Sequence, residues 1–167
     1  MEGFDHILNW RLLRGSHDFP GKGGGTCINE AAVVAAGFEY RAVRTVKDMP
    51  SCFSRPICEF AMFLNDQASD KERQRLLPFV MRLACADSEQ IERERQTYIS
   101  SKMIRSMSLD RGIEVLEGAL AIGRQADPVA LPVAEERMSA ARAKGCVAAA
   151  KPEKPLLATL KKLLEAI

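Results

Sequence analysis

The chain has 167 residues, a hydrophobic content of 47% and a net charge of +2 from 24 basic and 22 acidic side chains. This length and composition predict one globular domain with a packed core, and the balanced charge does not indicate nucleic-acid binding. No apolar run reaches the roughly 20 residues that span a bilayer, and residues 1–9 lack the basic start of a signal peptide, so we expect a cytoplasmic protein.

The first part of the chain is predicted to form a helix, a glycine-rich loop and a second helix. Asp5 can cap a helix that runs to Arg14. Five glycines and a proline then make residues 15–26 a loop. A helix from Cys27 to Ala36 follows, and its apolar face is mostly alanine. Since small side chains let a neighbouring backbone come close, we place this helix at the centre of the fold.

The middle of the chain joins an irregular stretch to two helix starts. Residues 38–53 are expected to be irregular. A helix with proline in its first turn begins at Ser54 or Arg55, because a missing N–H costs nothing there. The sequence Ser-Asp-Lys-Glu at 69–72 is a capping box that starts another helix, and Pro78 should kink or split it.

Two further helices are predicted before residue 127. Asp87 or Ser88 caps a helix that reaches about Met107. Its first turns, residues 89–96, are almost wholly charged or polar, and we expect them in solvent. Ser108 caps the next helix, which the Asp-Pro pair at 127–128 interrupts.

The last part of the chain is predicted to hold a helix, a linker and an amphipathic tail. The helix covers about 132–144, the linker 145–155, and the tail 156–167 has leucines on one face. A helix of this length is marginal alone in water. We therefore expect the tail to dock on its own core, a second copy or another protein. The chain reads as an all-α, single-domain bundle of six to seven helices, with the domain at 1–144.

The glycine-rich turn that delivers Cys27 to a helix start is the candidate site. A thiol at a helix N-terminus is expected to have a lowered pKa, and Glu30 lies one turn further on. His17, in the preceding loop, is the candidate base for a nucleophilic Cys27. The loop could also hold an anion, but its lysine and glycine spacing matches neither nucleotide-binding motif.

A zinc site and simple packing are the other interpretations of this turn. His17, Cys27, Cys52 and Cys58 supply ligand types that suit zinc, although no CxxC or HxxxH pair is present. The five cysteines are expected to be thiols rather than disulfides in a cytoplasmic protein. In the packing interpretation, which we favour, Cys27 is a small buried hydrophobe and Glu30 complements the helix dipole.

Several segments resemble a group of small bacterial proteins for which no activity is established. They read GSHDFPG at 15–21, GTCINEAA at 25–32 and CFSRP at 52–56, with Asn-Asp at 65–66 and Leu-Leu-Pro at 76–78. The similarity covers about residues 8–100. The resemblance implies a bacterial cytoplasmic protein and assigns no catalytic residues.

Two functions from different classes follow from the sequence. The first is a non-enzymatic protein-binding or accessory module that uses its charged helices and its C-terminal helix to contact a protein partner or a second copy. The alternative is a small thiol- or zinc-dependent enzyme centred on Cys27, with His17 and Glu30.

Overall fold

The computed structural model describes residues 10–18, 25–104 and 107–150. Within these ranges the protein is all-α, with one isolated backbone bridge and no strand, as predicted. The α-helices are α1 (Ile28–Ala35), α2 (Arg55–Gln67), α3 (Asp70–Arg73), α4 (Glu89–Lys102), α5 (Leu109–Leu120) and α6 (Leu131–Ala150). Two 3-10 helices, η2 (Val46–Asp48) and η3 (Gln74–Arg82), complete the order. No helix in the described ranges has the length and apolar character needed to cross a membrane.

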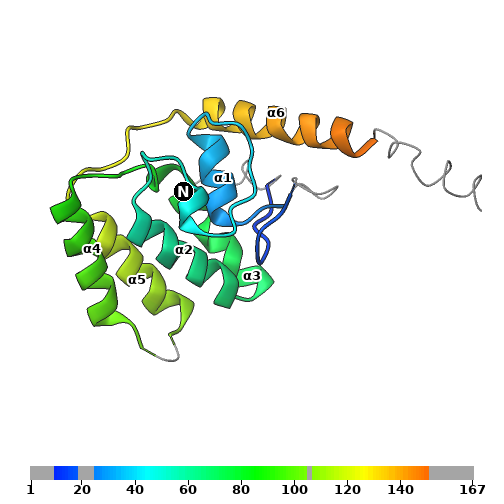
Figure 1. Cartoon of the computed structure of the whole chain (residues 1–167). Helices are drawn as coiled ribbons and strands as arrows, with labels where there is room; N and C mark the ends of the chain where they lie inside the picture. Colours follow the sequence, from blue (N-terminus) through cyan, green and yellow to red (C-terminus); the bar gives the residue numbers. More distant parts are fainter. Residues whose placement is uncertain (1–9, 19–24, 105–106, 151–167) are drawn as a thin grey trace, which may run out of the picture.

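The short helix α1 lies at the centre of the fold (Figure 1). All eight of its residues are buried, and it packs against α2, η3 and α6. Three alanines, Ala31, Ala32 and Ala35, let these neighbours approach closely. Gly37 follows with a φ of 95°, a conformation that favours glycine, so the chain turns away directly after the helix. The prediction of a central alanine-faced helix is confirmed.

Helices α2, α4 and α5 pack against one another on one side of α1 (Figure 1). Two glycines bring α5 close to its neighbours. A Cβ at Gly112 would lie 2.3 Å from the Leu64 side chain of α2, and one at Gly118 would lie 2.0 Å from the Tyr98 hydroxyl of α4. A side chain at either position would therefore require Leu64 or Tyr98 to move.

The helix starts lie where the sequence predicts them. Ser69, Ser88 and Ser108 are N-caps whose hydroxyls accept a backbone N–H of the first turn. Ser54 precedes α2, which carries a proline in its first turn. Pro78 lies inside η3, so the chain after the Ser69 capping box changes from α to 3-10 geometry, in agreement with the predicted split.

The predicted helix at Asp5–Arg14 is wrong for the part that the structure describes. Leu12 pairs with Thr26 in an isolated parallel bridge. The Gln74 side chain receives the Leu12 N–H and donates to its carbonyl, both at 2.9 Å. With its backbone groups occupied in this way, the fully buried Leu12 does not enter a helical turn. Residues 5–9 lie outside the described residues.

Helix α6 continues past the predicted linker boundary. It reaches Ala150, so residues 145–150 are helical rather than part of a linker. One glycine costs a helix only about 1 kcal/mol, and the alanines that follow Gly145 favour helix formation. The rest of the predicted linker, 151–155, and the predicted tail helix, 156–167, lie outside the described residues. Helix α4, in contrast, ends at Lys102, before the predicted Met107.

One residue of the charged 89–96 segment is buried, which corrects the prediction that this segment stands in solvent. Arg95 has no exposed surface. Its guanidinium donates to the carbonyls of Cys85, Ile122 and Arg124 and to the Glu92 carboxylate, at 2.7–2.9 Å. Arg95 therefore joins α4 to the chain on either side of it.

Candidate functional site

The Glu30 carboxylate is the centre of the predicted patch. Glu30 is the third residue of α1 and is completely buried. Its carboxylate accepts the Cys27 backbone N–H at 2.9 Å, and the Cys27 sulfur accepts the Glu30 N–H at 3.4 Å. This reciprocal pair is a capping box in which cysteine takes the place of the usual serine or threonine.

The same carboxylate also holds two segments that precede and follow α1. Ser16 donates its hydroxyl at 2.8 Å, and His17 donates its backbone N–H at 2.7 Å. The His17 ring lies at 3.1 Å through Nδ1, and the Val43 N–H donates at 3.2 Å. A carboxylate has about four acceptor positions, so Glu30 has little hydrogen-bonding capacity left for a ligand.

His17 is bound to Glu30 rather than to the Cys27 sulfur. Its carbonyl accepts the Tyr40 hydroxyl at 2.7 Å, which fixes the backbone beside the ring. A cysteine nucleophile needs a base within hydrogen-bond reach of its sulfur. The sulfur hydrogen bond found here comes instead from the Glu30 backbone. The structure thus brings together His17, Cys27 and Glu30, as the sequence suggests, but it links the first two through the third.

The Cys27 environment reverses the prediction of a lowered pKa. The residue is 1% exposed, and this burial raises the pKa of the thiol, as does the nearby Glu30 charge. The backbone N–H groups of Asn29 and Glu30 act in the opposite direction but with smaller effect. Desolvation therefore dominates the helix N-terminus, and Cys27 stays protonated at neutral pH.

The structure does not assemble the predicted zinc site. Cys52 is exposed and lines a separate hollow with Phe38 and Val80. Cys58 is buried in α2, where burial raises the pKa of its thiol. In the described part of the chain, which includes all four predicted ligands, no three His, Cys, Asp or Glu side chains are grouped as metal ligands. The loose spacing of the four residues is consistent with this separation.

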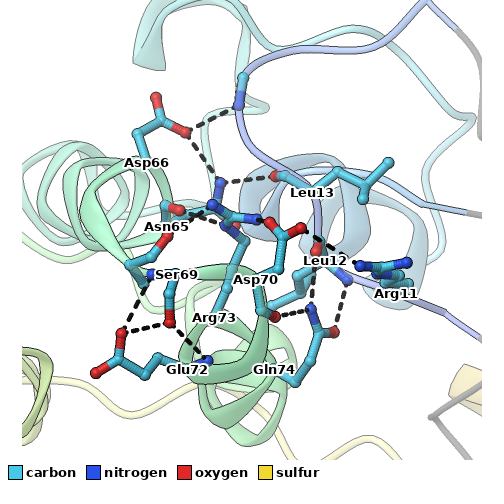
Figure 2. A network of polar contacts seen from close by, with 12 residues as sticks. Arg11, Leu12, Leu13, Asn65, Asp66, Ser69, Asp70, Glu72, Arg73 and Gln74 are labelled. Atoms are coloured by element: carbon cyan, nitrogen blue, oxygen red, sulfur yellow. Dashed lines mark hydrogen bonds and ion pairs between the residues drawn. The ribbon is translucent and has the colours of Figure 1, made fainter.

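A second polar network, which the sequence did not predict, holds the N-terminal segment against α2 and α3. Figure 2 shows Asn65 at its centre. The Asn65 amide accepts the Ile28 N–H at 3.3 Å and donates to the Leu13 carbonyl at 2.9 Å. Asp66 accepts the Gly15 N–H at 2.9 Å. The Asn-Asp pair at the end of α2 is therefore a clamp for two segments distant in sequence.

Arg73 anchors this network from the other side. Its side chain is 3% exposed and donates to the carbonyls of Asn65 and Ala68 at 2.6 and 2.7 Å. It also pairs with Asp70 at 2.6 Å (Figure 2). The hydrogen bonds of the patch and of this network join parts of the same chain. The buried Oδ1 of Asn29 has no hydrogen-bond partner in the described structure.

Besides the hollow that Cys52 lines, the described surface carries apolar grooves at α2/α4 and at α1/α6. The α2/α4 groove, of about 300 Å³, is lined by Pro56, Glu59, Phe60, Phe63, Gln96, Ile99, Ser100 and Met103. The α1/α6 groove, of about 370 Å³, is lined by Val34, Gly37, Phe38, Glu39, Tyr40, Arg137, Ala140, Ala141 and Lys144. The sequence did not predict the first groove, in which Met103, just beyond α4, is 42% exposed.

Comparison with known proteins adds no functional assignment. No protein-family model matches the chain, and no curated protein or solved structure is significantly similar to it.

Proposed function

We propose that this protein is a non-enzymatic binding module of the bacterial cytoplasm whose α2/α4 groove receives an amphipathic helix of a partner protein. The observation that carries the proposal is the apolar character of this groove. Phe60 and Ile99 form a buried floor, and Phe63 stacks on Phe60 with ring centroids 6.1 Å apart. Met103 continues the groove into open surface.

A helix laid along the groove would cover side chains that are now in water. Burying a Met side chain completely is worth about 1.5–3 kcal/mol, and Met103 of the groove lining is 42% exposed. Amphipathic helices bind such grooves through side chains at i, i+3, i+4 and i+7. Glu59 is the charged group of the lining, so a basic residue at the edge of the partner helix would complement it.

The polar centre of the molecule supports this function over the thiol- or zinc-dependent alternative. A thiol enzyme needs an ionised sulfur that a substrate can reach. Burial keeps the Cys27 thiol protonated, and Glu30 is surrounded by donors from its own chain. We therefore assign His17, Cys27 and Glu30 to holding the fold, and we place recognition at the groove.

Photocrosslinking in the native host tests this proposal. Ser100 lines the groove, whereas its neighbour Ser101 is exposed outside it. A benzophenone side chain at position 100 should trap a partner, and the same group at position 101 is the matched control. The trapped protein is then purified for binding measurements. Replacing both Phe63 and Met103 with Ser should weaken its binding at least about tenfold, since roughly 1.4 kcal/mol is tenfold.

Two results would contradict the proposal. One is equal trapping from positions 100 and 101, because a groove ligand touches only the first. The other is a partner whose affinity does not change when Phe63 and Met103 are both replaced. Circular dichroism of the doubly substituted protein checks that the helices are intact.

A further inference from the structure

The α1/α6 groove is a second apolar surface, independent of the proposed partner site. One side of the groove consists of Val34, in the last turn of α1, and of the exposed Phe38, which comes after the helix. On the other side it has Ala140 and Lys144 from α6. Its volume of about 370 Å³ gives room for a few aliphatic side chains. Phe38 is 40% exposed at its rim, so a ligand would remove a large aromatic surface from water.

We infer that this groove binds the chain's own C-terminal segment, residues 156–167. The apolar side chains of the segment recur at helical spacing, and they are Leu156, Leu157, Leu160, Leu163, Leu164 and Ile167. Lys162 and Glu165 fall on the opposite face of a helix. Such a segment is too short to be stable as an isolated helix, so it needs an apolar surface to fold against.

The distance along the chain fits the α1/α6 groove. Helix α6 ends at Ala150 and its C-terminal half extends past α1 (Figure 1). At 1.5 Å per residue, Lys144 lies about 9 Å and Arg137 about 20 Å back along the helix axis. Residues 151–155 contain two prolines that interrupt a helix, and they can span about 16–18 Å. A twelve-residue helix is about 18 Å long. If the chain reverses direction at 151–155, the tail helix would run back along α6 and cover the stretch from Ala150 to the groove.

The α2/α4 groove is a poorer match for the same segment. Figure 1 places α4 on the opposite side of the molecule from the end of α6. The short connection at 151–155 would have to cross the whole body to reach it. The two grooves therefore have different occupants, the tail in one and a partner helix in the other.

Thermal unfolding of the full chain tests the inference. Replacing Leu160 and Leu164 with Ser removes two apolar groups from one face of the tail. We expect Tm to fall by about 4–8 °C, since a chain of this size loses about 2–4 °C in Tm for each kcal/mol of unfolding free energy that is lost. The control replaces Lys162 and Glu165 with Ser and should leave Tm unchanged. Equal Tm values for the leucine variant and the parent protein would overturn the inference.

A double-mutant cycle locates the docking surface. Ala140 and Ala143 are both exposed on α6, but Ala140 lines the groove and Ala143 does not. Ala140→Glu should lower Tm in the parent protein, and it should have little further effect once Leu160 and Leu164 are replaced. Ala143→Glu should have no effect in either background. Additive losses would place the tail elsewhere and overturn the inference.

Light scattering shows whether the docked segment belongs to the same chain or to a second copy. A monomer mass for both the parent protein and the leucine variant supports docking within one chain. A parent dimer that the leucine substitutions convert to a monomer would mean that a second copy fills the groove, which contradicts the inference. These results do not depend on the α2/α4 groove, so they can fail while the proposed partner binding holds.

Discussion

Replacing Arg95 with Met tests how much of the fold depends on one buried cation. Methionine keeps the apolar stem of the side chain but lacks the buried guanidinium and with it every donor. The Arg95 guanidinium donates to the carbonyls of Cys85 and Ile122 at 2.7–2.9 Å. The Glu92 carboxylate, whose side chain is 20% exposed, also loses its cation at 2.7 Å.

The magnitude follows from these contacts. A buried polar group left without a partner costs about 1–3 kcal/mol, and two carbonyls are affected. Removing one member of a buried ion pair costs about 3–5 kcal/mol as a whole. The Arg124 carbonyl is in an exposed residue and can turn to water, so it adds little. We expect a loss of about 4 kcal/mol in the free energy of unfolding, and a Tm about 8–16 °C lower.

Urea unfolding followed by circular dichroism measures this loss. The control is Arg93→Met in the same helix, whose side chain is 64% exposed and pairs with Glu89 four residues earlier. Surface pairs of this kind contribute less than about 1 kcal/mol. If the two variants unfold at the same urea concentration with the same slope, Arg95 does not anchor the fold and the reasoning is wrong.

Three further predictions concern the thiols, the centre of the fold and acid. Iodoacetamide should label the exposed Cys52 much faster than Cys27 in the native protein, because burial raises the pKa of Cys27; similar rates would contradict this. Ala32→Leu should overpack α1 and cost about 1–3 kcal/mol in urea unfolding, whereas Ala143→Leu on the exposed face of α6 should not. The N–H groups of Arg124 and Ser88 hold the pKa of Asp87 below its usual 3.8 in the folded state. Its stabilising effect is therefore present above pH 4 and lost as pH falls further, so Asp87→Asn should flatten the fall in Tm between pH 6 and 3.

Local chemistry determines the parts of the fold that the sequence predicts correctly. Ser69, Ser88 and Ser108 start helices because each hydroxyl satisfies an N–H that lies within three residues of it. The alanine face of α1 predicts its central position, because small side chains are useful where backbones approach. Pro78 alters its helix through its own missing N–H. All of these effects act over one or two turns, so they can be read from neighbouring residues.

The chemistry of the candidate site can be judged only from the tertiary structure, because it depends on solvent exposure and on partners that are distant in sequence. The sequence brings attention to Cys27, Glu30 and His17, and these three do lie together. Whether Cys27 is a thiolate, however, depends on the competition between a helix N-terminus and desolvation, and only the burial of Cys27 decides it. The separation of Cys52 from this patch is likewise invisible to spacing along the chain.

Long-range backbone contacts account for the remaining errors. Leu12 is not helical because Gln74, 62 residues away, binds both of its backbone groups. Arg95 looks like part of a solvated charge run, but carbonyls from residues 85, 122 and 124 converge on it. The sequence by itself determined most helix starts and their serine caps, since those depend on groups within a turn of each other. Only the tertiary structure decided which charged and thiol side chains leave water, because desolvation depends on what the distant parts of the chain place around them.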